Sequence, residues 1–239
     1  MNKRFILFPF ILILIMSSVI ITDVFARSCP DYAVACGASA VYNVTMNKTE
    51  VSTTGSSTGA VTIVETPQTF DIASANAGAR VGGWFSGANL PPGTYNWMRR
   101  TVSRTFSGKG YVTSGGYDWY TSNNPDTSFG SGTNLRRVAT GAYTFIGTSV
   151  PSDYAEINFS VPTPPDPSYL PSGMTMTADS IVQEDTSTTV IIEKGRKSTM
   201  RITFNVGNTL QLQITNPPTN TEYKLFLGEP DASVTINYE

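Results

Sequence analysis

Histidine is absent from the 239 residues of this chain. It is the general base of Ser-His-Asp and Cys-His hydrolases and the commonest metal ligand, so its absence excludes those hydrolases and His-ligated zinc. Chemistry based on carboxylates alone, or on a Ser-Lys pair, stays open. No pair of acids has a spacing that suggests a glycosidase. We therefore expect a protein that is not an enzyme and that uses no cofactor.

Charge is scarce as well. Charged residues make up 14% of the chain, and the formal net charge is -2. Such a chain produces no strong field that would attract nucleic acid or an anionic membrane surface. We therefore expect neither nucleic acid nor a membrane surface as a partner. The polarity comes instead from Thr, Ser, Asn and Gly.

Cysteine occurs only twice, at Cys29 and Cys36. In an oxidising compartment the pair predicts one disulfide that closes a small loop. A redox-active pair usually has C-x-x-C spacing, and six residues separate these two. We expect a structural disulfide on an N-terminal arm, residues 27–40.

The one long apolar run lies at the N-terminus. Two basic residues precede the run over residues 5–21, and Ala26 supplies the small residue of a cleavage site. These features predict a signal peptide over residues 1–26. An uncleaved anchor is the first alternative, although the run is at the short limit for a span. A lipid anchor on Cys29 is the second, although the residues before it make a poor lipobox. We expect a secreted, periplasmic or cell-surface protein with no membrane span after cleavage.

Apolar and polar residues alternate with period two over much of the remaining chain, as at Tyr42, Val44 and Met46. Turn signals rich in Gly, Pro and Asn separate the alternating runs. Many short strands at this spacing predict an all-β protein, an antiparallel β-sandwich. The one helical candidate is Ile72 to Ala79. Strands are predicted at residues 42–50, 61–64, 69–72, 95–106, 155–161, 189–192, 200–206, 210–214, 223–227 and 234–238.

Five prolines fall within residues 162–171. Prolines at this density cannot belong to a hydrogen-bonded ladder, so they predict a stiff linker or a crossover between sheets. We expect one sandwich over residues 41–239, which the segment after the prolines completes. A second, smaller domain after the prolines is the alternative.

The sequence LPPGTY at residues 90–95 resembles the L-P-x-G-x-Y signature of transthyretin-like extracellular domains, the carboxypeptidase-regulatory-like and Cna-B-like group. The resemblance extends over residues 40–113. It implies a transthyretin- or Ig-like sandwich in which Pro-Gly makes a turn and Tyr95 points inward. It also implies roles as a surface stalk, as an adhesin module, or in carbohydrate or partner contact.

Cna-B-like domains often carry a first-strand lysine bonded covalently to a late-strand asparagine beside a buried carboxylate. The resemblance makes Lys48, Asn237 and Glu50 candidates for such an isopeptide bond. Burial would have to raise the pKa of the carboxylate and lower that of the lysine. The alternative is that Lys48 lies at a strand end and extends into water.

Residues 113–133 are rich in Gly, Ser and Asn and carry Tyr117, Trp119 and Tyr120. The composition predicts a long hairpin or loop excursion. Exposed aromatic rings stack on sugars or anchor partners, so these three residues are the predicted ligand-binding site. The alternative is that they fold back as a lid on the sandwich.

No metal site is predicted. Asn124, Asp126 and Ser128 are spaced like calcium ligands, but the glycine and the final glutamate of an EF-hand loop are missing. A series of Asx turns fits these residues better.

The last strand, Ala232 to Glu239, alternates strictly and carries a penultimate tyrosine. It resembles the end of fimbrial subunits of the chaperone–usher type, although a plain edge strand is the alternative. The expected function is a secreted, non-enzymatic surface or extracellular module with a structural or adhesive role. A carbohydrate-binding module, or a fimbrial-type subunit that assembles by strand exchange, are the alternatives. The expected partner is a glycan or another surface protein.

Overall fold

The computed structural model describes residues 28–31, 33–74, 83, 90–129, 134–145, 149–161, 172–195, 198–215, 222–228 and 230–238. At 198–203, 215 and 231–238 it describes the backbone only. The predicted signal peptide and the proline-rich segment lie outside the described residues. So does most of the helical candidate, of which Ile72 to Ser74 form a turn.

The described chain is an all-β antiparallel sandwich, as predicted. Its helical element is a single 3-10 turn, η1 (Thr127–Phe129). The strands are β1 (Ala33–Gly37), β2 (Ser39–Ser52), β3 (Val61–Val64), β4 (Gln68–Asp71), β5 (Gly93–Tyr95), β6 (Trp97–Ser103), β7 (Thr105–Ser114), β8 (Tyr117–Thr121), β9 (Leu135–Ala139), β10 (Ile157–Ser160), β11 (Met174–Met176), β12 (Ser180–Asp185), β13 (Val190–Ile192), β14 (Ser198–Asn205), β15 (Leu210–Thr215), β16 (Glu222–Leu227) and β17 (Asp231–Tyr238).

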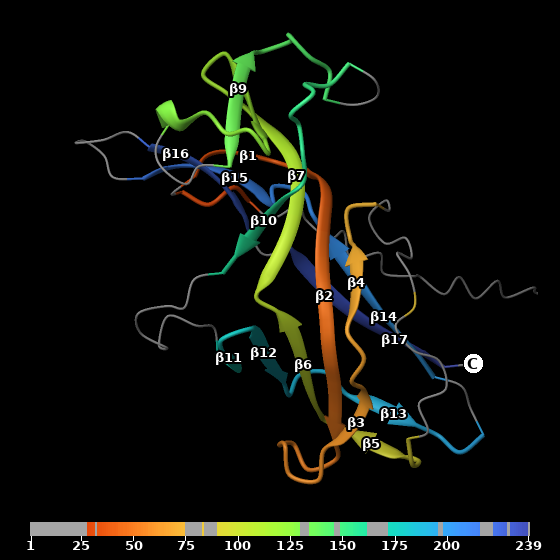
Figure 1. Ribbon diagram of the computed structural model, residues 1–239. Coiled ribbons are helices and arrows are strands. Elements are labelled where there is room, and N and C mark those ends of the chain that lie inside the picture. The colour runs from red at the N-terminus through yellow and green to blue at the C-terminus, as the bar shows by residue number, and fades with distance from the viewer. Residues whose placement is uncertain are drawn as a thin grey trace, which may run out of the picture.

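The long strand β2 is the spine of a ten-stranded sheet (Figure 1). Strands β6 and β7 follow one another along one edge of β2, and β3 and β4 pair with its other edge. Strands β12, β10 and β8 then pair with the far edge of β6 and β7. Strand β9 extends the sheet beyond β8, so the β7–β8–β9 end carries a compact antiparallel meander.

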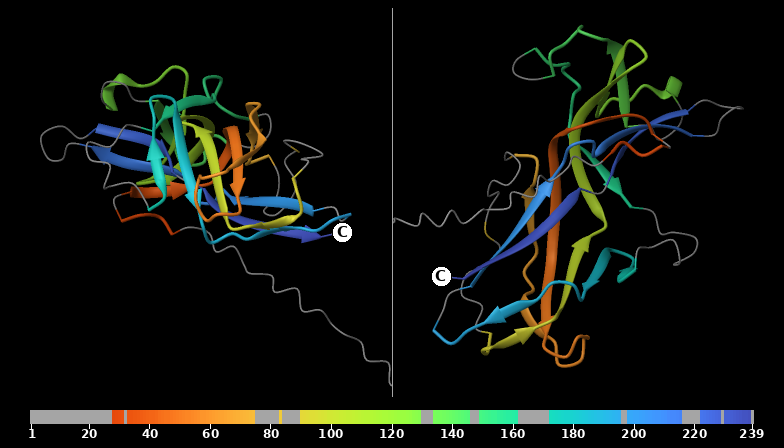
Figure 2. Two further views of the ribbon diagram at one scale, coloured as in Figure 1. Left: turned by 90° about the horizontal axis from the view of Figure 1, so that it is seen from below. Right: turned by 180° about the vertical axis from the view of Figure 1, so that it is seen from behind.

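Smaller sheets cover one face of this large sheet. Seen from behind, β14 and β17 cross β2 diagonally, and β1, β15 and β16 lie near the β8–β9 end (Figure 2). Strands that follow the proline-rich segment pair with strands that precede it: β12 with β6, β13 with β5, and β15 with β1. The second half of the chain therefore adds strands to sheets that the first half begins.

The core follows the alternation of β2. Tyr42, Val44 and Met46 are buried on one face, against Phe204 and Leu227 among others. A bulge interrupts the pairing of β2 with β6 just after Met46. Because a bulge adds one residue to one strand, it shifts which side chains point inward.

That bulge corrects the expectation for Lys48. Period two from Tyr42 would place its side chain in the core, but the shift brings Thr49 and Val51 inward instead. The amine of Lys48 forms ion pairs with Glu50 and Glu65. Its side chain is partly exposed, as in the alternative that the sequence left open.

Two glycines of β7 let the layers approach closely. A Cβ on Gly108 would lie 2.9 Å from the side chain of Leu227, and one on Gly110 would lie 2.9 Å from that of Leu210. Both distances are shorter than real Cβ contacts. The leucines of β15 and β16 therefore pack directly on the backbone of the large sheet.

The N-terminal arm is part of the sandwich. Cys29 and Cys36 form the predicted disulfide, with Cα atoms 5.7 Å apart. Strand β1 pairs with β15, a partner more than 170 residues away in sequence, and β2 begins at Ser39. The predicted boundary at residue 40 thus falls inside β2. The arm is too short to show an alternating pattern that would predict a strand. It becomes one because β15 supplies the partner for its backbone hydrogen bonds.

The tyrosine of the LPPGTY segment, Tyr95, points inward as expected. Tyr95 is buried, and its hydroxyl donates a hydrogen bond of 2.8 Å to the carbonyl of Pro91. The strand predicted over residues 95–106 is divided into β5, β6 and the start of β7. The breaks fall at Asn96, whose side chain accepts a bond from the Gly55 amide, and at Arg104.

Candidate functional site

Residues 113–133 were predicted as a long hairpin or a loop excursion, and the described part of this segment contains a hairpin. Strands β7 and β8 form a hairpin whose two-residue turn is Gly115–Gly116, with φ of 60° and 78°. Positive φ at both turn residues is the geometry of a tight type I′ turn, which glycine adopts without strain. The turn therefore places Tyr117, Trp119 and Tyr120 in a strand rather than in a loop.

Strand alternation divides these three aromatic residues. Tyr117 is 39% exposed, whereas Trp119 and Tyr120 are each 3% exposed. Trp119 packs into the core between the sheets, and Tyr120 packs on the opposite face with Phe145 and Tyr154. The three residues therefore do not form one exposed set, because neighbouring side chains of a strand point to opposite faces. The planes of Tyr117 and Trp119 are inclined by 68°.

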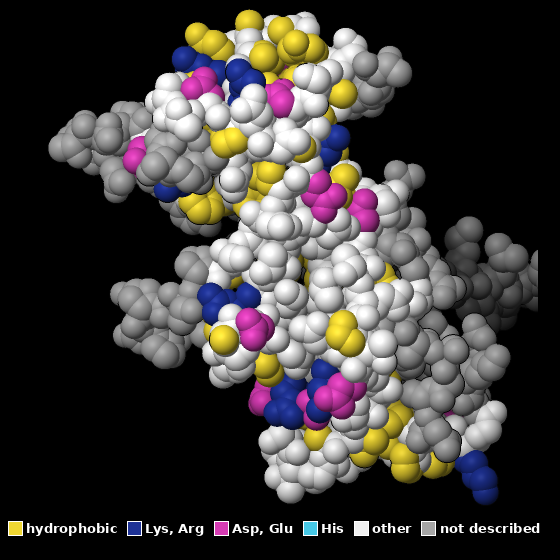
Figure 3. Space-filling view, in the orientation of Figure 1, with side chains coloured by type: hydrophobic (Ala, Val, Ile, Leu, Met, Phe, Trp, Pro, Cys, Tyr) yellow, Lys and Arg dark blue, Asp and Glu magenta, His cyan; other side chains and the backbone are white. Residues whose placement is uncertain are grey.

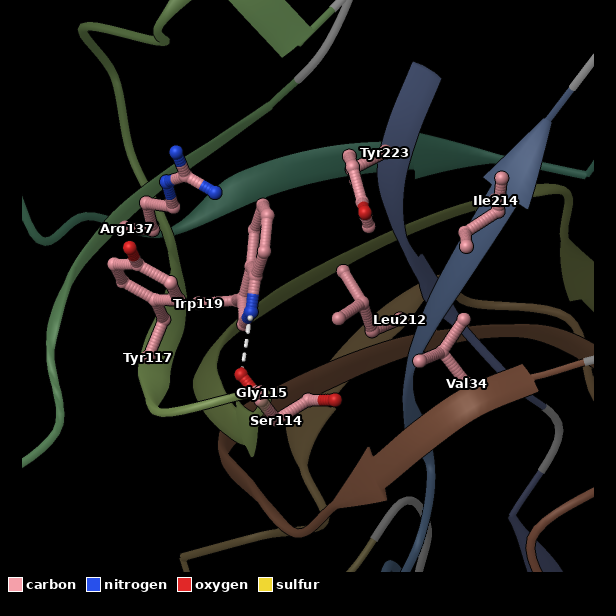
Figure 4. Close-up of a pocket in the computed structure, with 9 residues that line it drawn as sticks. All are labelled: Val34, Ser114, Gly115, Tyr117, Trp119, Arg137, Leu212, Ile214 and Tyr223. Carbon is pink, nitrogen blue, oxygen red and sulfur yellow. Dashed lines mark hydrogen bonds between the residues drawn. The ribbon is translucent and has the colours of Figure 1, made fainter. Parts of the chain in front are cut away.

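A cleft of about 240 Å³ opens beside Tyr117 and Trp119, where the β7–β8–β9 end of the large sheet meets the β1–β15–β16 sheet (Figure 4). We call it the end cleft. Tyr117, Trp119 and Arg137 come from the β8–β9 side, and the aliphatic side chains together with Tyr223 come from the β1–β15–β16 sheet. Its lining residues are Val34, Ser114, Gly115, Tyr117, Trp119, Arg137, Leu212, Ile214 and Tyr223.

Trp119 lies buried at the base of the end cleft and is not part of its exposed rim. Its ring stacks on Tyr223 with centroids 4.5 Å apart and planes 25° apart. The indole Nε1 donates a hydrogen bond to the carbonyl of Ser114. Because its ring is buried and its polar atom is paired, Trp119 joins the two sheets and offers little surface to a ligand.

Arg137 is the charged residue of the end cleft. Its guanidinium carbon lies 4.4 Å from the ring centroid of Tyr117, 4.7 Å from that of Phe129 and 5.3 Å from that of Trp119. The residue is exposed. Within the described chain it forms no ion pair with a carboxylate, whereas its neighbour Arg136 pairs with Asp153 at 3.0 Å. The sequence did not single out Arg137, because only the fold brings it to the aromatic rings.

The charge of Arg137 acts on the carboxyl group of Asp126. Hydrogen bonds from Ser128 are the main cause that lowers the pKa of Asp126, and the charges of Arg136 and Arg137 lower it further. The Ser128 amide donates to Asp126 Oδ1 at 3.0 Å, which is the Asx turn that the sequence predicted here. Among the described residues, no group of three or more acidic or cysteine side chains could hold a metal ion.

Tyr120 belongs to a polar network on the opposite face of β8. Its hydroxyl donates to Asp153 at 3.1 Å, and Ser122 and Arg136 donate to the same carboxylate. Burial, together with the charge of Asp153, raises the pKa of Tyr120 to about 12. These groups satisfy one another, so this network stabilises the sheet and presents no free group for a ligand.

The isopeptide candidates are only partly brought together. Lys48 Nζ lies 3.2 Å from Glu50 Oε1, and Arg99 Nε lies 2.7 Å from Glu50 Oε2. The hydrogen bond from Arg99 is the main cause that lowers the pKa of Glu50, opposite in direction to what the bond-forming reaction needs. Asn237 pairs through its backbone with Thr199 of β14, and its side chain is outside the described residues. The isopeptide bond remains a prediction.

Charges of both signs lie together on the face of the molecule in Figure 3. In the space-filling view, basic and acidic side chains lie next to one another in the lower part of the molecule, and further side chains of both signs lie among hydrophobic ones near its top (Figure 3). Opposite charges that are already paired leave little net field on this face.

No family model matches this sequence, and neither the curated proteins nor the solved structures contain a significant match. The resemblance of residues 90–95 to transthyretin-like domains therefore remains a prediction. Within the described part of the chain, no helix has the length and apolar character needed to cross a membrane.

Proposed function

We propose that this chain is a secreted, non-enzymatic module for adhesion at a surface, and that it binds a glycan at the end cleft. The observation that carries the proposal is the open rim of that cleft, where the exposed ring of Tyr117 and the guanidinium of Arg137 lie together. Concave sites lined by aromatic and aliphatic groups with a few polar ones are typical binding sites.

The surroundings of the rim suit binding. Tyr117 and Arg137 lie on neighbouring strands, and a tight turn and a stacked pair of rings behind them hold the strands in place. Residues on a rigid scaffold lose little conformational entropy when they bind a ligand. Aromatic side chains with an exposed face stack on the C–H faces of sugars.

The N-terminal segment and the disulfide support secretion. A signal peptide over residues 1–26 would deliver the chain to an oxidising compartment, where a bond between Cys29 and Cys36 persists. Strand exchange has less support. The N-terminal arm would be the donated strand of a fimbrial subunit, but here its strand β1 pairs with β15 of the same chain. The last strand, where a chaperone would dock, already pairs with β14 over its whole length.

A glycan array probed with purified protein, residues 27–239, tests the proposal. Tyr117→Ala removes the exposed ring of the rim. Tyr143→Ala is the matched control, because Tyr143 is 38% exposed and belongs to the opposite face of the sheet. We expect glycan binding that Tyr117→Ala abolishes and Tyr143→Ala leaves intact. Absence of binding by the unaltered protein, or equal losses in both variants, would overturn the proposal.

A further inference from the structure

We propose that the ligand of the end cleft is an acidic sugar, a ring that carries a carboxylate, and that Arg137 binds this carboxylate. The inference rests on the function proposed above and specifies its ligand class. It starts from the state of the guanidinium, which is held by aromatic rings and has no ion-pair partner among the described residues.

The guanidinium of Arg137 contacts its neighbours through the π-systems of their aromatic rings. The rings of Tyr117 and Phe129 lie within 4.7 Å of the guanidinium carbon. Such cation–π contacts fix the position of the group without using its N–H donors. Within the described chain the side chain of Arg137 donates no hydrogen bond, so its five donors remain for water or for a ligand.

A planar guanidinium presents two parallel N–H groups that match the two oxygens of a carboxylate. Bonds of this charge-assisted, bidentate kind are stronger than bonds to a neutral hydroxyl. Rings that already hold the guanidinium reduce the entropy that binding would cost. Arg137 is therefore suited to a carboxylate more than to a neutral sugar.

The charges around the end cleft favour an anion. None of the described residues that line it is acidic. Asp126, whose carboxylate accepts hydrogen bonds from Ser128, is the acid that Arg137 influences electrostatically, and it is not among the lining residues. A ligand with a carboxylate at the rim would find a cation there and no opposing charge in the lining.

The rest of the cleft suits the apolar face of a sugar ring. Val34, Leu212 and Ile214 form an aliphatic side, and the ring of Tyr117 stands at the rim (Figure 4). A volume of about 240 Å³ is below the roughly 300–1,000 Å³ of sites that enclose a drug-sized ligand. One ring or a chain end therefore fits better than a long stretch of polymer.

The hairpin turn leaves room for the remainder of a glycan. A Cβ built on Gly115 or Gly116 would meet no atom within 4 Å. The space next to the rim is thus open on the turn side. A terminal acidic ring could enter the cleft while the chain attached to it continues outward past the turn.

The test compares matched ligands first, since this comparison needs no protein variant. Oligosaccharides that end in a uronic acid are titrated against the purified protein beside the same molecules after carboxyl reduction, which converts the acid into a neutral hexose. We expect binding to weaken about 10- to 100-fold on reduction, the range for loss of a charge-assisted hydrogen bond. A sulfated neutral oligosaccharide is the third arm, and it should bind less tightly than the uronate.

Variants of Arg137 then locate the contact. Arg137→Gln should lower affinity for the uronate to that for the reduced sugar, and Arg137→Lys should restore only part of the loss because lysine lacks the fork. Arg136→Gln removes the same charge from the neighbouring residue, whose guanidinium pairs with Asp153, and should change affinity less than about twofold by the usual weight of rim charges. Thermal unfolding of each variant verifies that it is folded.

The outcomes separate the two proposals. Equal affinity for the acidic and the reduced sugar, with binding that still needs Tyr117, would overturn the acidic-sugar inference and leave the proposed function standing. Tighter binding of the sulfated sugar than of the uronate would also overturn it, because it would show a general anion site. Binding to none of the three would overturn the acidic-sugar inference, and the glycan array would then decide the proposed function.

Discussion

Trp119 of β8 and Tyr223 of β16 stack with their ring centroids 4.5 Å apart, and this contact joins the two sheets at the end cleft. Tyr117, two residues before Trp119 on the same face of the strand, is 39% exposed. One strand thus supplies both a buried ring that holds the layers together and an exposed ring at the rim. The two rings should respond differently to substitution.

We predict that Trp119→Ala lowers the free energy of unfolding by about 3–5 kcal/mol, the range for removal of a large buried aromatic side chain. Tyr117→Ala should cost about 1 kcal/mol or less, since its ring is partly exposed and is not one of the buried core side chains. Urea denaturation measures both, with Tyr143→Ala as an exposed-ring control. A larger cost for Tyr117→Ala than for Trp119→Ala would contradict this assignment of roles.

The strands themselves were predictable, because period-two patterns reflect burial of one face. Residues 61–64, 210–214 and 223–227 were predicted as strands, and β3, β15 and β16 occupy them. The alternation of β2 also predicted its core face as far as Met46. Beyond that residue the bulge reverses the pattern, and no local signal in the sequence marks it.

The end cleft could be predicted only in part. Tyr117 and Trp119 were selected from the composition of their segment, which left a hairpin or a loop open. The hairpin forms, and strand alternation turns Tyr120 to the opposite face. Arg137, Val34 and Tyr223 come from segments far apart in the sequence. They meet because β1 pairs with β15 and β8 with β9, and long-range pairing is not encoded in any one segment.

Acid should weaken the fold through Glu50. Its carboxylate is nearly buried and holds bonds to Arg99 and Lys48, which lower its pKa below the usual 4.5. A lowered folded-state pKa adds stability above the unfolded pKa, and this stability is lost as pH falls through the folded value. We predict that Glu50→Gln lowers the free energy of unfolding near neutral pH, and that the difference from the unaltered protein shrinks below pH 4.5.

Unfolding in urea, repeated from neutral pH to about pH 3, measures that difference. Asp153 and Asp185 also have lowered pKa values, so the unaltered protein loses stability in acid from several sites, and only the difference isolates Glu50. Glu65→Gln is the control, because Glu65 also pairs with Lys48 but is largely exposed. A difference for Glu50→Gln that stays constant with pH would show that its charge contributes no stability.

Reduction of the disulfide should have a small, measurable effect. The bond between Cys29 and Cys36 closes a loop of only a few residues, so the chain-entropy relation gives about 2.5 kcal/mol. We predict that the Cys29→Ser, Cys36→Ser double variant stays folded and loses about that much free energy of unfolding. Hydrogen exchange should rise first in β1, whose pairing with β15 lies next to the bond. Complete unfolding of the variant would mean that the disulfide holds more of the sandwich than its own loop.

A cation buried on the core side of β6 gives the last prediction. The side chain of Arg100 is 12% exposed, its Nε has no hydrogen-bond partner, and burial lowers its pKa. One guanidinium nitrogen lies 3.7 Å from Asp185 Oδ2, and that carboxylate also accepts hydrogen bonds from Ser187 and Thr188. The arrangement is a buried ion pair in which the arginine depends on the aspartate and the aspartate has other partners.

Removing one partner of a buried pair leaves an uncompensated charge, whereas replacing it by an apolar side chain of similar volume is often neutral or stabilising. We therefore predict that Asp185→Ala costs about 3 kcal/mol, the lower end of the range for buried pairs because both groups keep some exposure. Arg100→Met should change the free energy of unfolding by less than about 1 kcal/mol or increase it. In a double-mutant cycle, Asp185→Ala should cost clearly less in the Arg100→Met background, and the remainder measures the hydrogen bonds to Ser187 and Thr188. An equal cost in both backgrounds would mean that Asp185 stabilises its own turn and not the arginine.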